Sequence, residues 1–167
     1  MAKITLKGNP IHTCGELPQI GSKGKDFILI DDKLAPKTLK DFAGKVKILY
    51  TVPSLDTPTC SLSTKKFSEA LASHPEIAML VISADLPFAQ GRVCGSENIK
   101  NIHTLSLMRS KQFASDYGVL ITDGPLEGLT ARAIVVLGKD DVVLYTELVS
   151  EIAQEPNYDK ALAAALK

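Results

Sequence analysis

The sequence has 167 residues, of which 45% are hydrophobic, and its 19 basic and 19 acidic residues give a formal net charge of zero. This length and composition suit one globular α/β domain spanning residues 1–167. A neutral chain gives no support to a nucleic-acid partner or to a polybasic membrane anchor. No apolar run approaches membrane-spanning length and Met1–Lys7 lacks the apolar core of a signal peptide, so we expect a cytoplasmic protein. In that compartment its three cysteines are more commonly reduced, catalytic or metal-binding than structural disulfides.

The first half of the chain consists of short extended segments separated by turns. Ile4–Leu6 and Ile11–Thr13 alternate apolar and polar residues around Gly8-Asn9-Pro10, which predicts an N-terminal β-hairpin. β-Branched and aromatic residues indicate the strands that follow. In order, we predict a strand over Phe27–Ile30, a turn at 31–33, at most one helical turn over Thr38–Phe42 and a core strand over Val46–Val52.

The second half alternates helices and strands. Apolar residues at helical spacing predict a helix from Thr57 to about Ser73, and the apolar run Ile77–Ser83 predicts a strand covered on both faces. With the core strand before them, these make a right-handed βαβ unit. We then predict a short helix over Pro87–Val93 broken at Gly95, a loop at His103, a short helix over Phe113–Tyr117, a hairpin of Ile134–Leu137 with Val142–Tyr145, and a closing helix over Tyr158–Lys167. The order fits a thioredoxin-like α/β fold, with a mixed central sheet and helices on both faces.

A cysteine lies at the start of the helix that follows the core strand. Thr57 followed by Pro58 is typical of an N-cap and a first helical position, because proline lacks the N–H that would have no partner there. This places Cys60 third in the helix, where unpaired N–H groups and the helix dipole favour negative charge. Cys60 is therefore a candidate thiolate and nucleophile. The alternative is a small buried hydrophobic residue at a helix start.

The spacing of Pro53, Thr57 and Cys60 resembles the Pro-x-x-x-Thr-x-x-Cys active-site motif of peroxiredoxins. Other stretches are similar to the bacterial thiol peroxidase subgroup of the atypical two-cysteine peroxiredoxins. They are Ser83–Gln90, Arg92–Gly95, Asp116–Val119, Thr122–Leu126 and Ala131–Ala133. The resemblance covers nearly the whole chain. It implies a thioredoxin-like fold and a thiol-dependent peroxidase that reduces hydrogen peroxide and organic (alkyl) hydroperoxides in antioxidant defence and redox homeostasis.

The resemblance also implies a role for each site residue. Cys60 would be the peroxidatic cysteine, whose thiolate attacks the peroxide and becomes a sulfenic acid. Thr57 and Arg132 would hold the peroxide, with Arg132 also stabilising the thiolate, and Pro53 would shield it from solvent. Cys94 would be the resolving cysteine, which forms an intramolecular Cys60–Cys94 disulfide.

Such a disulfide needs Cα atoms about 5.5 Å apart. If Cys60 and Cys94 lie in different helices, as the pattern predicts, that separation is not expected in the reduced protein. We therefore expect parts of both segments to unwind on oxidation. Gly91 and Gly95 bracket Cys94 and lower the helix stability there, which is consistent with this expectation.

Several of these residues have a simpler interpretation. Thr57 could serve only as a cap, Arg132 could be a solvated residue at a strand end, and Cys94 could be an unpaired buried cysteine. Cys14, in the N-terminal hairpin, lies outside the family pattern and we interpret it as incidental. His12 shares its strand face, but two ligands are weak evidence for a metal, and we predict no metal site.

The resemblance implies thioredoxin, or a similar thiol reductant, as the partner that reopens the disulfide. It also implies a small hydroperoxide substrate and a homodimer, with no cofactor and no nucleic-acid or membrane partner. Two other functions compete with this prediction. Disulfide exchange on proteins usually uses Cys-x-x-Cys, whereas Thr57 stands at the first of those positions here. A thioredoxin-like binding module would carry its cysteines for structure alone.

Overall fold

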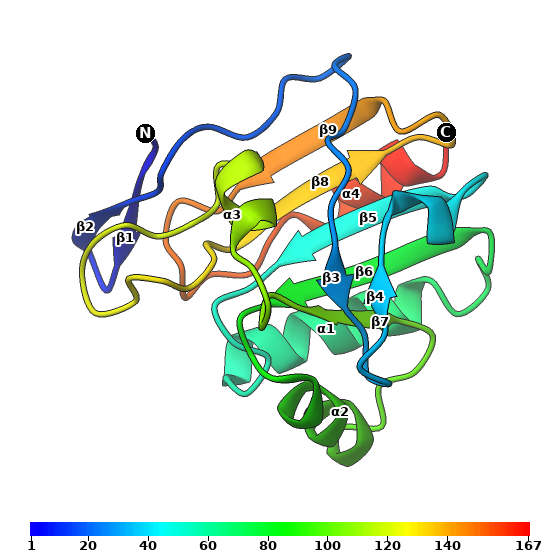
Figure 1. Cartoon of the computed structure of the whole chain (residues 1–167), viewed down its shortest axis with the longest axis horizontal. Helices are drawn as coiled ribbons and strands as arrows, with labels where there is room; N and C mark the ends of the chain where they lie inside the picture. Colours follow the sequence, from blue (N-terminus) through cyan, green and yellow to red (C-terminus); the bar gives the residue numbers. More distant parts are fainter.

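The computed structural model describes residues 1–167 as a seven-stranded mixed sheet with helices on both faces, beside a two-stranded N-terminal hairpin (Figure 1). The strand order in the large sheet is β4-β3-β7-β6-β5-β8-β9. The strands are β1 (Lys3–Leu6), β2 (Asn9–His12), β3 (Leu29–Ile30), β4 (Pro36–Lys37), β5 (Val46–Thr51), β6 (Ile77–Ser83), β7 (His103–Ser106), β8 (Ala133–Leu137) and β9 (Val143–Leu148). The helices are η1 (Leu39–Phe42), α1 (Pro58–Ala70), α2 (Pro87–Ser96), α3 (Gln112–Asp116) and α4 (Tyr158–Ala165). None of them is both long enough and apolar enough to cross a bilayer. The predicted α/β class, mixed sheet and N-terminal hairpin are confirmed.

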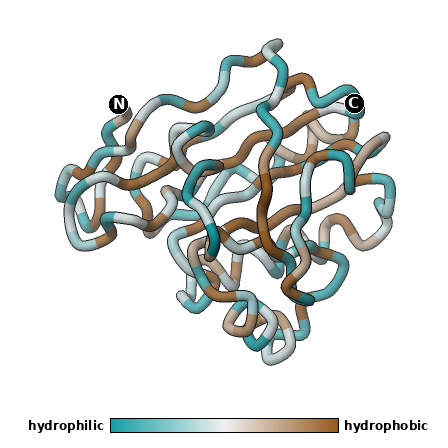
Figure 2. The backbone as a smooth tube through the Cα atoms, in the orientation of Figure 1, coloured by the Kyte–Doolittle hydropathy of each residue, from teal (hydrophilic) through white to brown (hydrophobic).

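The predicted βαβ unit forms the centre of the sheet. β5 and β6 pair in parallel from Val46↔Ile77 to Thr51↔Ile82, and α1 connects them. Every residue of both strands is buried, and most of their length is hydrophobic in Figure 2. Parallel strands covered on both faces require apolar residues at nearly every position. The unit brings the start of α1 to the carboxyl end of the central strands, where α/β proteins commonly place their sites.

The sheet separates two hydrophobic clusters. On one face α1 and α4 cover a cluster that contains Tyr50 and Cys60. On the other face lies a cluster that contains Leu49, and there Phe113 of α3 meets Phe27 edge-on, with ring centroids 5.5 Å apart. Figure 1 shows α1 and α4 behind the sheet and α3 in front of it. Because successive strand residues point to opposite faces, neighbouring residues of β5 contribute to different clusters.

The structure corrects several predicted bounds. His103, predicted to lie in a loop, begins β7, a short strand held by parallel pairing with β6. The predicted helix broken at Gly95 continues through that glycine to Ser96, because burial of Val93 and Gln90 on the inner face of α2 outweighs a propensity cost of about 1 kcal/mol. The strand predicted over Phe27–Ile30 is shorter, since only Leu29 and Ile30 pair with neighbours.

The first long helix also ends earlier than predicted. α1 stops at Ala70 rather than near Ser73, and Leu71 takes the C-cap position with its side chain buried in the core. The chain then turns through His74 toward Pro75, whose ring disfavours helical geometry in the residue before it. α1 thus ends about one turn before the predicted stop at His74-Pro75.

A cation is buried in the central strand. The side chain of Lys47 is 0% exposed, and its Nζ forms an ion pair with Asp141 in the turn between β8 and β9. Nζ also donates to the Gly138 backbone oxygen at 3.5 Å. Asp141 has a φ of 66°, in the left-handed region that Asn and Asp tolerate better than most residues. Because a buried charge is stable only when it is paired, this ion pair ties the β8–β9 turn to β5.

Replacing Asp141 with Asn should lower the free energy of unfolding by about 3 kcal/mol, because a buried ammonium loses its counter-charge while the backbone preference is kept. Urea unfolding monitored by circular dichroism measures the change. The double variant Lys47→Met/Asp141→Asn should recover most of the loss, since no charge then stays buried. An Asp141→Asn protein as stable as the unaltered chain would contradict this account of the pair.

Candidate active site

Cys60 lies in the first turn of α1, as predicted, and its side chain is 0% exposed. Thr57 occupies the N-cap position with an extended backbone (φ −130°, ψ 151°), and Pro58 is the first helical residue. The segment from Val52 to Thr57 leads from the carboxyl end of β5 into this helix. The sulfur is therefore held at a helix N-terminus, where negative charge is favoured, and is shielded by the apolar cluster under α1.

Arg132 contacts the sulfur. Its Nη2 lies 3.2 Å from Cys60 Sγ, its Nη1 donates to the Tyr50 hydroxyl at 2.8 Å, and its Nε donates to the Ile152 backbone oxygen at 2.9 Å. The arginine is only 2% exposed, so the interpretation of a solvated strand-end residue is wrong. It immediately precedes β8, whose antiparallel pairing with β5 (Thr51↔Ala133) brings it beside the end of the central strand.

Tyr50 joins the arginine to the cysteine helix. Its hydroxyl lies 2.7 Å from Ser63 Oγ, and Ser63 Oγ donates to the Cys60 backbone oxygen at 3.1 Å. Burial raises the pKa of Tyr50 to about 12, even though the positive charge of Arg132 acts in the opposite direction. The phenol is therefore neutral near pH 7 and orients the guanidinium by accepting its hydrogen bond.

Thr57 has the predicted position but not the predicted hydrogen bond. Its hydroxyl donates to the Ser54 backbone oxygen at 3.0 Å, and its side chain makes no capping bond to α1. With its hydrogen directed at Ser54, the hydroxyl oxygen keeps lone pairs free to accept another hydrogen bond. Pro53 is buried at the start of the same loop.

Cys94 lies in a separate helix. It is half-buried in α2, and all three cysteines are free thiols. Burial raises the pKa of Cys94, and the negative charge of Asp32 raises it further. At neutral pH this sulfur is therefore a protonated thiol.

A groove of about 550 Å³ runs between the two cysteine-bearing helices. Leu55, Thr57 and Pro58 line it on the side of α1, and Val93 and Ser96 line it on the side of α2. Of the predicted site residues, Thr57 lines this groove, whereas Cys60 and Arg132 are buried and do not line it. A second hollow, of about 440 Å³, is lined by Phe27 and Phe113 and therefore lies on the other face of the sheet.

Known proteins share this sequence and structure. The Redoxin family matches residues 19–162. The chain is 53% identical over 167 residues to the thiol peroxidase of Leptospira interrogans (serogroup Icterohaemorrhagiae, serovar copenhageni), covering 99% of this chain and 98% of that protein. It is 51% identical over 164 residues to the thiol peroxidase of Mycobacterium bovis, covering 98% of each. Its structure matches a peroxiredoxin-like protein from Aquifex aeolicus with a TM-score of 0.93 and 38% identity, covering 99% of this chain and 96% of that one.

The chain belongs to the Redoxin family. Within that family it groups with the bacterial thiol peroxidases, as the resemblance in its motifs implied. The thioredoxin-like fold is confirmed with it. The predicted class of enzyme, a thiol-dependent peroxidase, is likewise confirmed.

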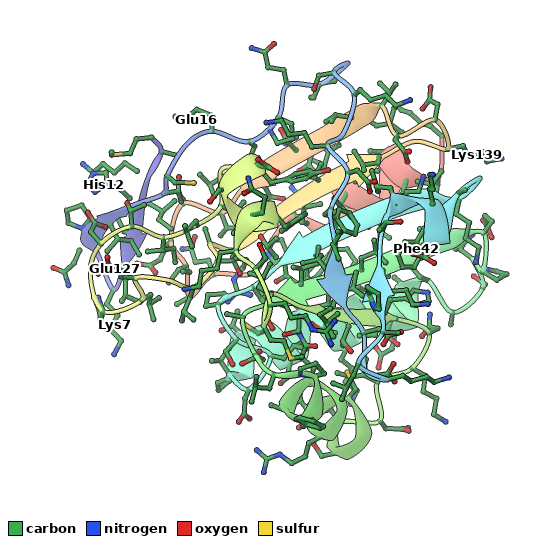
Figure 3. All side chains as sticks on the ribbon, in the orientation of Figure 1. Lys7, His12, Glu16, Phe42, Glu127 and Lys139 are labelled. Atoms are coloured by element: carbon green, nitrogen blue, oxygen red, sulfur yellow. The ribbon has the colours of Figure 1, made fainter.

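The third cysteine of this redoxin lies elsewhere in the molecule. Cys14 is exposed, and its sulfur lies 3.8 Å from the backbone oxygens of Ala114 and Ser115 in α3. His12, labelled on the N-terminal hairpin in Figure 3, has its Nδ1 2.7 Å from a carboxylate oxygen of Asp123. No group of three or more His, Cys, Asp or Glu side chains is placed to hold a metal ion. That Cys14 is incidental stays a prediction.

Sequence reasoning missed Tyr50, which it treated only as a strand residue. The alternation of β5 contained a signal, because Tyr50 shares a face with Ile48 and Val52. A phenol on a face covered by a helix needs a buried hydrogen-bond partner. The partner itself, Arg132, lies 82 residues away and could not be identified from that pattern.

The phenols of this redoxin give a test by pH. Burial raises the pKa of Tyr50 and Tyr145 to about 12 and also raises those of Tyr117 and Tyr158. A phenol whose pKa is raised in the folded protein stabilises the fold at pH values below its unfolded pKa of 10.0. This stabilisation is lost as the pH rises through the folded-state pKa. We expect no tyrosinate absorbance to appear in the folded protein near pH 10, and ionisation to accompany alkaline unfolding. A reversible phenolate step near pH 10 in the folded protein would contradict the burial of these rings.

Proposed function

We propose that Cys60 is the peroxidatic cysteine of this thiol peroxidase. The observation that carries the proposal is the 3.2 Å contact between Arg132 Nη2 and Cys60 Sγ in a buried setting. The guanidinium stabilises the thiolate, which attacks one oxygen of the hydroperoxide. The S–O bond forms as the O–O bond breaks, so the sulfur is oxidised to a sulfenic acid and the peroxide is reduced to water or an alcohol.

Thr57, Arg132 and Pro53 prepare this step in the proposal. The Thr57 oxygen, whose own hydrogen is engaged by Ser54, accepts a hydrogen bond from the peroxide O–H. Arg132 is fixed by three hydrogen bonds and stabilises the charge that develops on the departing oxygen. Pro53, buried at the entrance to the loop, limits the access of water to the sulfur. Hydrogen peroxide and small alkyl hydroperoxides both present the O–H that this arrangement recognises.

Cys94 completes the cycle as the resolving cysteine. Its sulfur attacks the sulfenic acid and the Cys60–Cys94 disulfide forms with release of water. Because the two cysteines lie in different helices, the start of α1 and part of α2 must unwind for the sulfurs to meet. The raised pKa of Cys94 keeps its thiol unreactive while α2 is folded, and exposure of α2 on unwinding removes that effect.

Reduction of the disulfide requires an external thiolate. Thioredoxin, or a similar dithiol reductant, would attack one sulfur, form a mixed disulfide and release the reduced enzyme. We place the protein in the cytoplasm, where the environment is reducing and disulfides are usually transient and catalytic. If no dithiol reductant supports continued peroxide consumption by the protein, this assignment of the partner is wrong.

We also propose a homodimer. Phe88, at the start of α2, is 68% exposed, and Met108 is also exposed, so both offer apolar surface to a second copy. Within each chain, residues 1–167 form one domain in this proposal, because a single large sheet carries every helix. Sedimentation equilibrium tests the dimer, and a monomer at high protein concentration would contradict it. Urea unfolding tests the single domain: one transition, the same by every probe, is expected, and two separate transitions would contradict it.

Disulfide exchange on proteins is less well supported. The fold offers Thr57 where such enzymes carry the first cysteine of Cys-x-x-Cys, and Cys60 is fully buried. A sulfur that is 0% exposed is out of reach of a substrate protein, and the groove beside it is lined by Thr57 and not by the sulfur. Reduction of insulin in the absence of peroxide would favour disulfide exchange instead.

Cysteine variants test the assignment of the sulfurs. Cys60→Ser should abolish peroxide consumption, because no other thiol contacts Arg132. Cys94→Ser should react once per chain and gain one oxygen without forming a disulfide or turning over with thioredoxin. Cys14→Ser is the matched control and should behave like the unaltered protein. Peroxide assays and intact-mass measurements separate these outcomes, and full activity in Cys60→Ser would refute the proposal.

The Thr57 hydroxyl can be tested with two substitutions of similar size. Thr57→Val removes the hydroxyl and should lower the rate of Cys60 oxidation by about a hundredfold, the cost typical of losing one group that binds a reacting oxygen. Thr57→Ser keeps the hydroxyl and should react at nearly the original rate. Stopped-flow measurement of the first oxidation compares them. Equal rates for both variants would show that Thr57 serves only to start the helix.

A further inference from the structure

Three donors converge on the carboxylate of Asp85, which lies between β6 and α2. Ser54 Oγ donates to its Oδ1, while the Leu55 backbone N–H and Ser83 Oγ donate to its Oδ2, each at 2.7 Å. Ser54 and Leu55 belong to the loop that connects β5 to α1, 30 or more residues earlier in the chain. Asp85 therefore fixes the loop that precedes Cys60 to the neighbouring strand end.

The hydrogen bonds continue from Asp85 toward the site. Ser54 gives its hydroxyl hydrogen to Asp85, and its backbone oxygen accepts the Thr57 hydroxyl at 3.0 Å. Ser54 Oγ also accepts the backbone N–H of Asp56 at 3.1 Å. The orientation of the Ser54 peptide thus determines where the Thr57 hydrogen points and which lone pairs of Thr57 face the groove.

The same carboxylate is linked to the helix that carries Cys94. Ser83 Oγ accepts a hydrogen bond from Gln90 Nε2 of α2 at 3.0 Å, and Gln90 Nε2 also lies 3.0 Å from the Leu105 backbone oxygen. Gln90 is fully buried, and its Oε1 is the one buried side-chain oxygen or nitrogen without a partner. Ser106 donates to the backbone oxygen of Asp85, which holds this residue to β7. Asp85 is thus the point at which the two cysteine-bearing segments meet.

We propose that Asp85 is a positioning residue for peroxide reduction. Its carboxylate holds Ser54 and Leu55 so that Thr57 presents a hydrogen-bond acceptor to the peroxide, an inference that rests on the proposed roles of Cys60 and Thr57. A carboxylate suits the task because it only accepts hydrogen bonds and can satisfy all three donors. The Leu55 N–H is fixed by the backbone and cannot turn away from a side chain that also donates.

Asp85→Asn is the decisive variant, because it keeps the size of the side chain and places an NH₂ against at least one of the donors. We expect the rate of Cys60 oxidation by hydrogen peroxide to fall by about tenfold to a hundredfold, because a small displacement of a group that positions the substrate lowers a reaction rate by this much. The rate of Cys60 alkylation by iodoacetamide, and its dependence on pH, should stay unchanged. Alkylation does not use Thr57, and Arg132 keeps its contact with the sulfur.

Asp56→Asn is the matched control, since Asp56 lies in the same loop but its side chain is 62% exposed. It should react with peroxide like the unaltered protein. Ser54→Ala removes one of the three donors to Asp85 and should give a smaller loss in the rate of reaction with peroxide. If Asp85→Asn does not fold, the rate of Ser54→Ala is compared with that of Asp56→Asn instead.

A slow peroxide reaction with unchanged alkylation supports the positioning role. Asp85→Asn or, in its place, Ser54→Ala reacting with peroxide as fast as Asp56→Asn would overturn it. So would an alkylation profile that shifts along with the peroxide rate, because Asp85 would then act through the sulfur or the whole fold. Failure of the proposed function is seen separately, in the unaltered chain: no peroxide consumption there would remove the basis of both proposals.

Discussion

The contact of a buried guanidinium with a buried sulfur is the interaction on which the site depends. An arginine that is 2% exposed is destabilising unless its donors are satisfied, and here a sulfur, a phenol and a backbone oxygen satisfy them. Of the two ionisable partners, Tyr50 is neutral near pH 7 because burial raises its pKa to about 12. The positive charge of Arg132 therefore lies against the Cys60 sulfur, which is the atom that attacks the peroxide in the proposed function.

Pairing at the ends of the central strands fixes this contact. β8 runs antiparallel to β5 with Ala133 opposite Thr51, so the residue before β8 lies at the end of β5. Two hydroxyls join the same backbones, because Thr51 Oγ1 donates to the Ala131 oxygen at 2.7 Å and Thr130 Oγ1 donates to the Val52 oxygen at 2.6 Å. A shift of one residue in this register would turn Arg132 to the other face of the sheet, away from the sulfur.

The two cysteines occupy environments of different stability. Cys60 belongs to the hydrophobic cluster under α1 and contacts a fixed arginine, whereas Cys94 is half-buried in a helix that contains two glycines and one unsatisfied buried oxygen. Regions with few buried contacts open at lower cost than the core. The proposed cycle uses this difference, because peroxide attack needs a fixed geometry and disulfide formation needs a segment that can move. Asp85 lies where these two segments meet.

The sequence alone determined the βαβ unit, the N-terminal hairpin, the start of α1 and the position of Cys60 in its first turn, because periodicity, turn residues and proline preference act over a few neighbouring residues. The spacing of its motifs was also sufficient to identify the family. The motif resemblance implied that Arg132 acts on Cys60. Only the tertiary structure decided that Arg132 is buried, that Tyr50 orients it, that the Thr57 hydroxyl points to Ser54, and that α2 passes through Gly95. Arg132 and Cys60 are 72 residues apart, and their contact exists only once strand register has set which distant residues lie side by side.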